Sequence, residues 1–142
     1  MNRPHVISFE KSDIASIAQL DKLPTVCIFL IRESLNSIAL EQAVKACVNA
    51  GAVFFLCCGD AADVVEDEID AVLETLSADG YLVSTTTHQQ ESNEDIANFA
   101  LHSCYIEDAF FRCLVIYDSL KDLTVNSLIE EIDLQILLRD SL

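Results

Sequence analysis

The sequence predicts a single α/β domain over residues 1–142, in which helices cover both faces of a mainly parallel sheet of four to five strands. Three observations support this prediction. A chain of 142 residues has the length of one ordinary domain and is long enough to bury a core. Apolar runs of strand length alternate with segments whose apolar residues recur at helical spacing. Most of these runs do not alternate polar with apolar residues, which is typical of parallel strands covered on both faces.

The expected strands are short runs rich in β-branched and aromatic residues. They are Thr25–Ile31, Ala52–Cys58, Tyr81–Thr87 and Arg112–Asp118. The third run, YLVSTTT, is more polar than the others, which places it nearer an edge of the sheet. A shorter run, His5–Phe9, is a candidate fifth strand.

The expected helices fill the gaps between the strands, because each gap carries an apolar stripe at helical spacing. The stripes are Leu40, Ala43, Val44 and Cys47; Val65, Ile69, Val72, Leu73 and Leu76; Ile96, Phe99, Ala100 and Cys104; and Val125, Leu128, Ile129, Ile132 and Ile136. Gly51 is placed to end the first helix, and Ser92 with Asp95 predicts a capped start of the third.

The C-terminal residues Leu134, Leu137 and Leu138 fall off the last apolar stripe. They predict either a second buried face of the final helix or a further short strand. From Thr25 onward strands and helices alternate, which favours right-handed βαβ units. The sequence therefore predicts one Rossmann-like domain with three layers.

The charge of the chain is strongly negative and unevenly distributed. The net charge is −16, and no Lys or Arg occurs between Lys45 and Arg112. Such a chain attracts cationic partners and repels phosphate backbones, so the sequence argues against direct binding of DNA or RNA. The interval without cations is the first place to expect a partner-binding surface.

The acidic side chains of GDAADVVEDEIDAVLETLSADG, residues 59–80, recur every three or four residues and so share one helical face opposite the apolar stripe. The expected partner-binding residues are Asp63, Glu66, Asp67, Asp70 and Glu74, with Glu91, Glu94 and Asp95 as further candidates. Like charges four residues apart cost a helix about 0.2–0.5 kcal/mol per pair. A solvated face is the simpler alternative, but solvation alone does not require so long an interval without a cation. We therefore expect this helix to bind a basic protein partner.

A second interpretation places a catalytic site at the carboxyl ends of the strands, where ligands bind in open parallel sheets. The candidates there are Cys58 as nucleophile, His88 as base and Asp118 to orient the imidazole, for a small hydrolase or transferase. Bulky residues precede Cys58, and nearby carboxylates would raise the pKa of its thiol, so the pattern also fits a buried cysteine.

Standard motifs for cofactors and metals are missing from the sequence. There is no G-x-x-x-x-G-K-[ST] loop, no G-x-G-x-x-G, no C-x-x-C pair and no D-x-[DN]-x-[DN]-G loop, so we expect neither a cofactor nor a metal site. The N-terminus lacks an apolar signal segment, and no 18 consecutive residues are apolar. The cysteines lie in apolar runs, as free buried thiols do. We expect a reduced, cytoplasmic protein without a membrane partner.

In chain size, in the lack of a signal segment and in the acidic run of residues 59–80, the sequence resembles the small immunity proteins that bacteria encode beside polymorphic or contact-dependent toxins. The resemblance implies a non-enzymatic inhibitor that neutralises a basic toxin domain, such as a nuclease. A third interpretation is a homo-oligomer that assembles through the C-terminal leucines.

Overall fold

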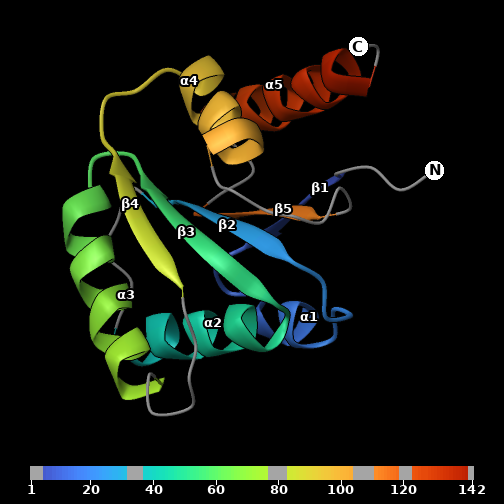
Figure 1. Ribbon diagram of the computed structural model, residues 1–142. Coiled ribbons are helices and arrows are strands. Elements are labelled where there is room, and N and C mark those ends of the chain that lie inside the picture. Colours follow the sequence, from blue (N-terminus) through green and yellow to red (C-terminus); the bar gives the residue numbers. More distant parts are fainter. Residues whose placement is uncertain (1–4, 32–36, 77–82, 104–110, 119–122, 141–142) are drawn as a thin grey trace.

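The computed structural model describes residues 5–31, 37–76, 83–103, 111–118 and 123–140 (Figure 1). Its centre is an all-parallel sheet with the strand order β1-β5-β2-β3-β4. The strands are β1 His5–Glu10, β2 Thr25–Leu30, β3 Ala52–Cys58, β4 Ser84–His88 and β5 Arg112–Tyr117. The candidate strand near the N-terminus is confirmed as β1, and the more polar third run is confirmed as an edge strand, β4.

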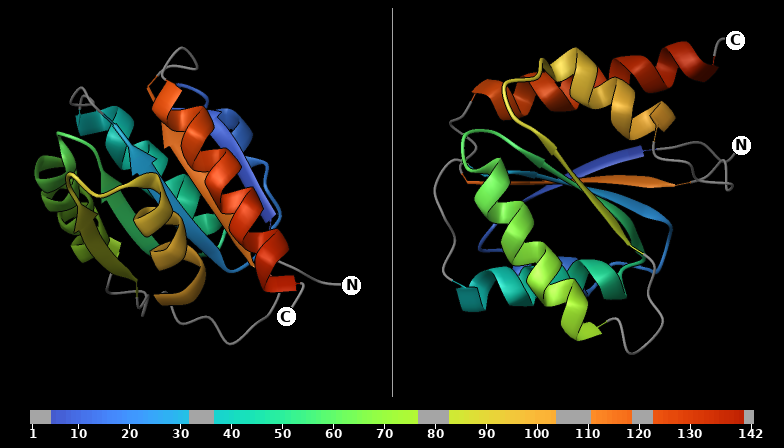
Figure 2. Two further views of the ribbon diagram at one scale, coloured as in Figure 1. Left: turned by 90° about the horizontal axis from the view of Figure 1, so that it is seen from above. Right: turned by 60° about the vertical axis from the view of Figure 1, so that its left-hand side comes forward.

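Helices cover both faces of this sheet, so the predicted three-layer α/β class is confirmed (Figures 1 and 2). One face carries α1 Ile14–Ala18, α2 Ser37–Asn49 and α3 Ala62–Leu76. The other face carries α4 Asn93–Asn98, a π-helical turn η2 Phe99–Ser103, and α5 Leu123–Asp140. Within these ranges, no helix combines the length and the apolar character needed to cross a membrane.

Successive side chains of each central strand point to opposite faces of the sheet and pack in two separate hydrophobic cores. Phe29 and Phe55 point toward α2 and α3, where their rings meet edge to face at a centroid distance of 5.8 Å. Ile28 and Leu56 point toward α4 and α5. Strands β2 and β5 are buried along their whole length, which explains why their sequences are apolar throughout rather than alternating.

Two local predictions about helix ends are confirmed. Gly51 follows the end of α2 with a φ of +105°, and its N–H donates to the carbonyl of Val48. A Cβ at this position would overlap the backbone carbonyl of Leu23, so a side chain is sterically excluded as well. At the start of α4, the Ser92 hydroxyl accepts a hydrogen bond of 3.1 Å from the Asp95 N–H.

Both expectations for the C-terminal leucines are wrong. Helix α5 continues to Asp140, and Leu134, Leu137 and Leu138 are 49%, 55% and 57% exposed. The physical reason is that Leu128 and Ile132, one turn apart, already cover the sheet on the opposite side of the same helix. Among other expectations, β4 ends one residue later than predicted, while Tyr81, Leu82 and Cys104 lie outside the described residues.

Candidate functional site

Helix α3 presents the five carboxylates predicted for partner binding as one row, which we call the acidic stripe: Asp63, Glu66, Asp67, Asp70 and Glu74. The stripe forms because Ala62, Val65 and Ile69 are buried against the sheet, which leaves the intervening residues on the outer side of the helix. Asp63, Asp67 and Glu74 are exposed, whereas Glu66 and Asp70 are half-buried.

Two members of the acidic stripe also interact with their surroundings. Asp70 Oδ1 accepts a hydrogen bond of 2.6 Å from Thr85 Oγ1 on the edge strand β4. Partial burial raises the pKa of Glu66, and the neighbouring carboxylates Asp70, Asp67 and Asp63 raise it further. Burial and the like charges along α3 therefore both favour the protonated form of Glu66.

No lysine or arginine in the described part of the chain forms an ion pair with Asp63, Glu66, Asp67 or Asp70. The described lysine ion pairs lie elsewhere, with Lys11 Nζ 2.8 Å from Asp118 Oδ1 and Lys45 Nζ 2.8 Å from Glu41 Oε1. The field of these four carboxylates is thus not neutralised by the described cations.

The other three predicted carboxylates, Glu91, Glu94 and Asp95, lie in or just before α4, on the opposite face of the sheet from α3 (Figure 2). The eight candidates therefore form two separate groups. Proximity in sequence suggested one surface, but the crossover from β4 places the next helix on the other face.

Glu94 and Asp95 line a groove of about 600 Å³ between α4 and α5, which lie side by side. The lining residues are Glu94, Asp95, Asn98 and His102 from α4 and η2, and Glu131, Leu134, Gln135 and Leu138 from α5. Gln135 Nε2 donates to the Glu94 carbonyl at 3.2 Å and to Glu131 Oε1 at 3.1 Å, so one amide links the two walls. The sequence analysis did not identify Glu131 and Gln135 as site residues. The only signal near them was that Leu134 and Leu138 fall off the apolar stripe of the helix.

A smaller polar pocket of about 200 Å³ lies at the carboxyl ends of the strands, where the catalytic interpretation had placed its site. Its lining residues are Leu30, Gly59, Asp60, His88, Gln90, Glu91, Asn93, Ile96 and Thr124. Gln90 adopts a φ of +63°, which is uncommon for a residue with a side chain. This conformation belongs to the tight turn that carries the chain from β4 to α4.

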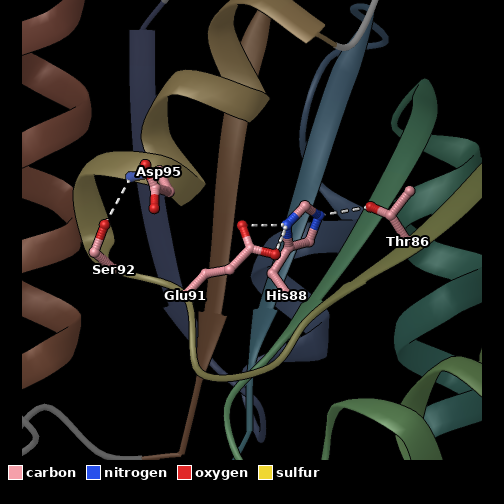
Figure 3. Close-up of polar contacts among 5 residues, drawn as sticks. All are labelled: Thr86, His88, Glu91, Ser92 and Asp95. Carbon is pink, nitrogen blue, oxygen red and sulfur yellow. Dashed lines mark hydrogen bonds and ion pairs between the residues drawn. The ribbon is translucent and has the colours of Figure 1, made fainter.

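His88 is only 4% exposed, and both of its ring nitrogens are engaged (Figure 3). Its Nδ1 lies 3.1 Å from each carboxylate oxygen of Glu91, and its Nε2 lies 2.7 Å from Thr86 Oγ1. The ring also packs edge to face on Phe99, at a centroid distance of 4.5 Å. Glu91 therefore orients the imidazole, which is a role that the sequence did not reveal.

The structure brings together two of the three catalytic candidates. Cys58 and His88 are register partners on neighbouring strands and lie on the same face of the sheet. Asp118 follows β5, which β2 separates from β3, and it binds Lys11 instead. His88 thus takes its carboxylate partner from Glu91, and the hydroxyl at its other nitrogen is that of Thr86 rather than a thiol.

The thiols at the end of β3 are poorly placed for nucleophilic chemistry. Cys58 is 1% exposed, and burial, followed by Cys57 and Glu91, raises its pKa far above the ordinary range. Burial together with Glu66 and Asp70 raises the pKa of Cys57 to about 12. Cys27, Cys47 and Cys113 are buried as well. In the ranges that the structure describes, no three His, Cys, Asp or Glu side chains are grouped to hold a metal ion.

Comparison with known proteins gives one match. No curated protein and no solved structure matches the chain. One family model, described as "Domain of unknown function (DUF7684)", matches residues 6–132. This range begins in β1 and ends within α5, so it includes part or all of every strand and of every helix in both layers. The chain therefore belongs to the DUF7684 family.

Proposed function

We propose that the protein is a non-enzymatic binding module that captures a positively charged protein through the acidic stripe of α3. The observation that carries this proposal is a row of carboxylates in which Asp63, Glu66, Asp67 and Asp70 have no ion pair with a described cation. Such a row destabilises its own helix, and a cationic partner would offset that cost. Opposite charges across an interface also accelerate association and select the partner.

The biological form of this activity is an inhibitor or immunity protein that neutralises a basic toxin, such as a nuclease. The surface with which a nuclease binds its substrate is positive, because it must attract phosphates. An acidic protein can cover that surface, whereas its own charge of −16 opposes direct contact with nucleic acid. In the described ranges, Cys27, Cys47, Cys57 and Cys58 are free and buried, which supports a place in the reducing cytoplasm.

The catalytic alternative has weaker support from the geometry. A thiol nucleophile needs a lowered pKa and access to substrate, but Cys58 has a raised pKa and is buried. Its register partner His88 is already held at both nitrogens. These contacts favour a structural role for the cluster, in which the imidazole ties β4 to the turn that leads into α4.

The stripe is best tested with the double variant Asp63→Lys/Asp67→Lys, because both side chains are exposed. Asp70 is unsuitable, since its exchange would also remove the hydrogen bond from Thr85. The double variant Glu10→Lys/Asp133→Lys changes the net charge by the same amount at exposed positions outside α3 and is the matched control. Immobilised forms of all three proteins would be used to retain basic proteins from a lysate of the source cells.

The retained protein would then be purified and its association with each form followed by stopped-flow fluorescence. At low salt the stripe variant should associate about tenfold or more slowly than wild type, and its association rate should depend less on ionic strength. The control should associate at the wild-type rate. The wild-type protein should also inhibit any nuclease or other toxic activity of the retained protein. Equal association rates for the two variants would reject the stripe as the binding surface.

A further inference from the structure

The groove between α4 and α5 combines apolar and acidic side chains in a way that the acidic stripe does not. Leu134 and Leu138 lie one turn apart on its α5 wall and are about half exposed, and Leu137 is equally exposed beside them. The other exposed large hydrophobic residues in the described ranges are Ile38 and Val64, on the opposite layer of the molecule. Exposed apolar side chains gathered in this way mark interaction sites.

The charged residues that line the groove give it a negative charge. Glu94 and Asp95 lie on one wall and Glu131 on the other, and no lysine or arginine is among the described lining residues. Gln135 on the α5 wall donates to the Glu94 carbonyl on the other wall and to Glu131 on its own. Beneath them, Ile96 from α4 and Leu128 and Ile132 from α5 pack in one core. The groove is therefore present before any partner binds, which lowers the entropic cost of binding.

Charge decides between the two simplest occupants. A second copy of this chain would bring its own carboxylates against Glu94, Asp95 and Glu131, on molecules that each carry a net charge of −16. A helix with leucines on one face and lysines or arginines on its flanks would instead fill the apolar part and pair with the acidic rim. From Glu131 to Leu138 the groove follows about two turns of α5, roughly 10 Å, which matches apolar anchors at i, i+3 or i+4 and i+7.

We propose that the groove between α4 and α5 binds a basic amphipathic helix of a partner protein. This inference rests on the proposed function, because it takes the partner to be cationic, and it adds that the partner presents a helix. It concerns the opposite face of the sheet from the acidic stripe. The two surfaces can therefore be tested one at a time.

The probe is a synthetic helical peptide of leucine and lysine with all leucines on one face. A scrambled peptide of the same composition and charge, without an apolar face, measures binding that depends on charge alone. Fluorescence anisotropy at physiological salt would compare the two peptides on wild type and on Leu134→Gln/Leu138→Gln. The double variant Ile38→Gln/Val64→Gln removes exposed apolar side chains from the other layer and is the matched control. All substituted side chains are exposed, and circular dichroism would verify that each variant folds.

Wild type and the control should bind the amphipathic peptide about tenfold or more tightly than the scrambled one. The groove variant should bind both peptides equally. The proposal is overturned if wild type does not prefer the amphipathic peptide, or if the groove variant keeps the preference. It is also overturned if wild type sediments as a dimer that the leucine substitutions dissociate, because the groove would then be a contact between copies.

The stripe variant Asp63→Lys/Asp67→Lys separates this proposal from the previous one. It should keep the preference for the amphipathic peptide, since α3 lies on the other face of the sheet. Loss of that preference in the stripe variant would overturn the groove as an independent site. If the preference survives while the association rate with the retained basic protein equals that of the control, the proposed function of the stripe fails and the groove stands.

Discussion

Arg112 is a charged residue at the first position of the buried strand β5, and it is only 3% exposed. Its guanidinium donates to the carbonyls of Asp21 and Ala50, at 3.0 and 2.9 Å, and to the hydroxyl of Thr25, at 3.2 and 3.1 Å. Burial lowers the pKa of Arg112, but an arginine remains protonated under all ordinary conditions. One side chain thus joins the end of α2, the loop before β2 and the start of β5.

We expect the substitution Arg112→Met to lower the free energy of unfolding by about 2–4 kcal/mol, because a buried carbonyl, a partly buried carbonyl and a buried hydroxyl lose a charged donor. Urea titration followed by circular dichroism measures this change. Lys45→Met is the control, since the exposed pair of Lys45 with Glu41 contributes less than about 1 kcal/mol. A similar loss in the two variants would contradict the structural role of Arg112.

Cys57 and Cys58 provide a second prediction at the scale of single residues. With pKa values of about 12 for Cys57 and higher for Cys58, almost no thiolate is present at neutral pH, and both side chains are buried. Iodoacetamide should therefore modify neither thiol in the native protein during the time in which it fully alkylates the unfolded chain. Mass spectrometry of the digested protein measures the extent of modification. Rapid native labelling of Cys58 would revive the catalytic alternative.

At the scale of elements, α3 combines a well-packed inner side with an outer side of mutually repelling charges. Glu66 is at the centre of this conflict, with Asp63 and Asp70 three and four residues away. Its raised pKa means that the folded state holds the Glu66 proton more strongly than the unfolded chain does. The stability associated with this group is therefore complete below the ordinary glutamate pKa and is lost as the pH rises through the raised value.

The substitution Glu66→Gln removes this charge and should raise the free energy of unfolding at pH 7 by about 0.5 kcal/mol. The difference between the variant and wild type should shrink as the pH falls through the raised pKa of Glu66 and vanish below the ordinary glutamate value. Urea titrations of both proteins at a series of pH values measure it. A difference that stays constant or grows on acidification would refute the repulsion. Other groups also titrate in this range, such as His5, which has a pKa lowered by burial. Their effects are the same in both proteins and cancel in the difference between variant and wild type.

At the scale of the whole molecule, a net charge of −16 on 142 residues opposes folding through self-repulsion. The acidic stripe alone contains three pairs of like charges four residues apart, Asp63–Asp67, Glu66–Asp70 and Asp70–Glu74, at about 0.2–0.5 kcal/mol each. Salt screens such repulsion between exposed charges. Raising NaCl from about 0.05 M to about 0.5 M should therefore raise the free energy of unfolding by about 1 kcal/mol.

Thermal or urea unfolding at each salt concentration provides the measurement. Asp63→Lys/Asp67→Lys should be less sensitive to salt than wild type, because lysines replace two repelling carboxylates with attracting charges. Equal sensitivity in the two proteins would show that the repulsion does not arise from α3.

The sequence by itself determined the α/β class and the edge position of the polar strand β4. It also determined that α2 ends at Gly51 and that α4 starts after Ser92. These features depend on apolar periodicity and on bonds between residues a few positions apart, which a sequence displays directly. It also identified the acidic face of α3, because helical spacing alone places those carboxylates opposite a buried stripe.

Only the tertiary structure decided which distant residues meet. The position of β5 between β1 and β2 directs Asp118 to Lys11, and it directs Arg112 to Ala50, which is 62 positions away in the sequence. The choice of sheet face for α4 and α5 separates Glu94 from the acidic stripe and places it beside Leu134 in the groove. The physical reason is that such contacts follow from strand order and from the face that each crossover takes, and the burial of both cores together determines these, rather than any local pattern.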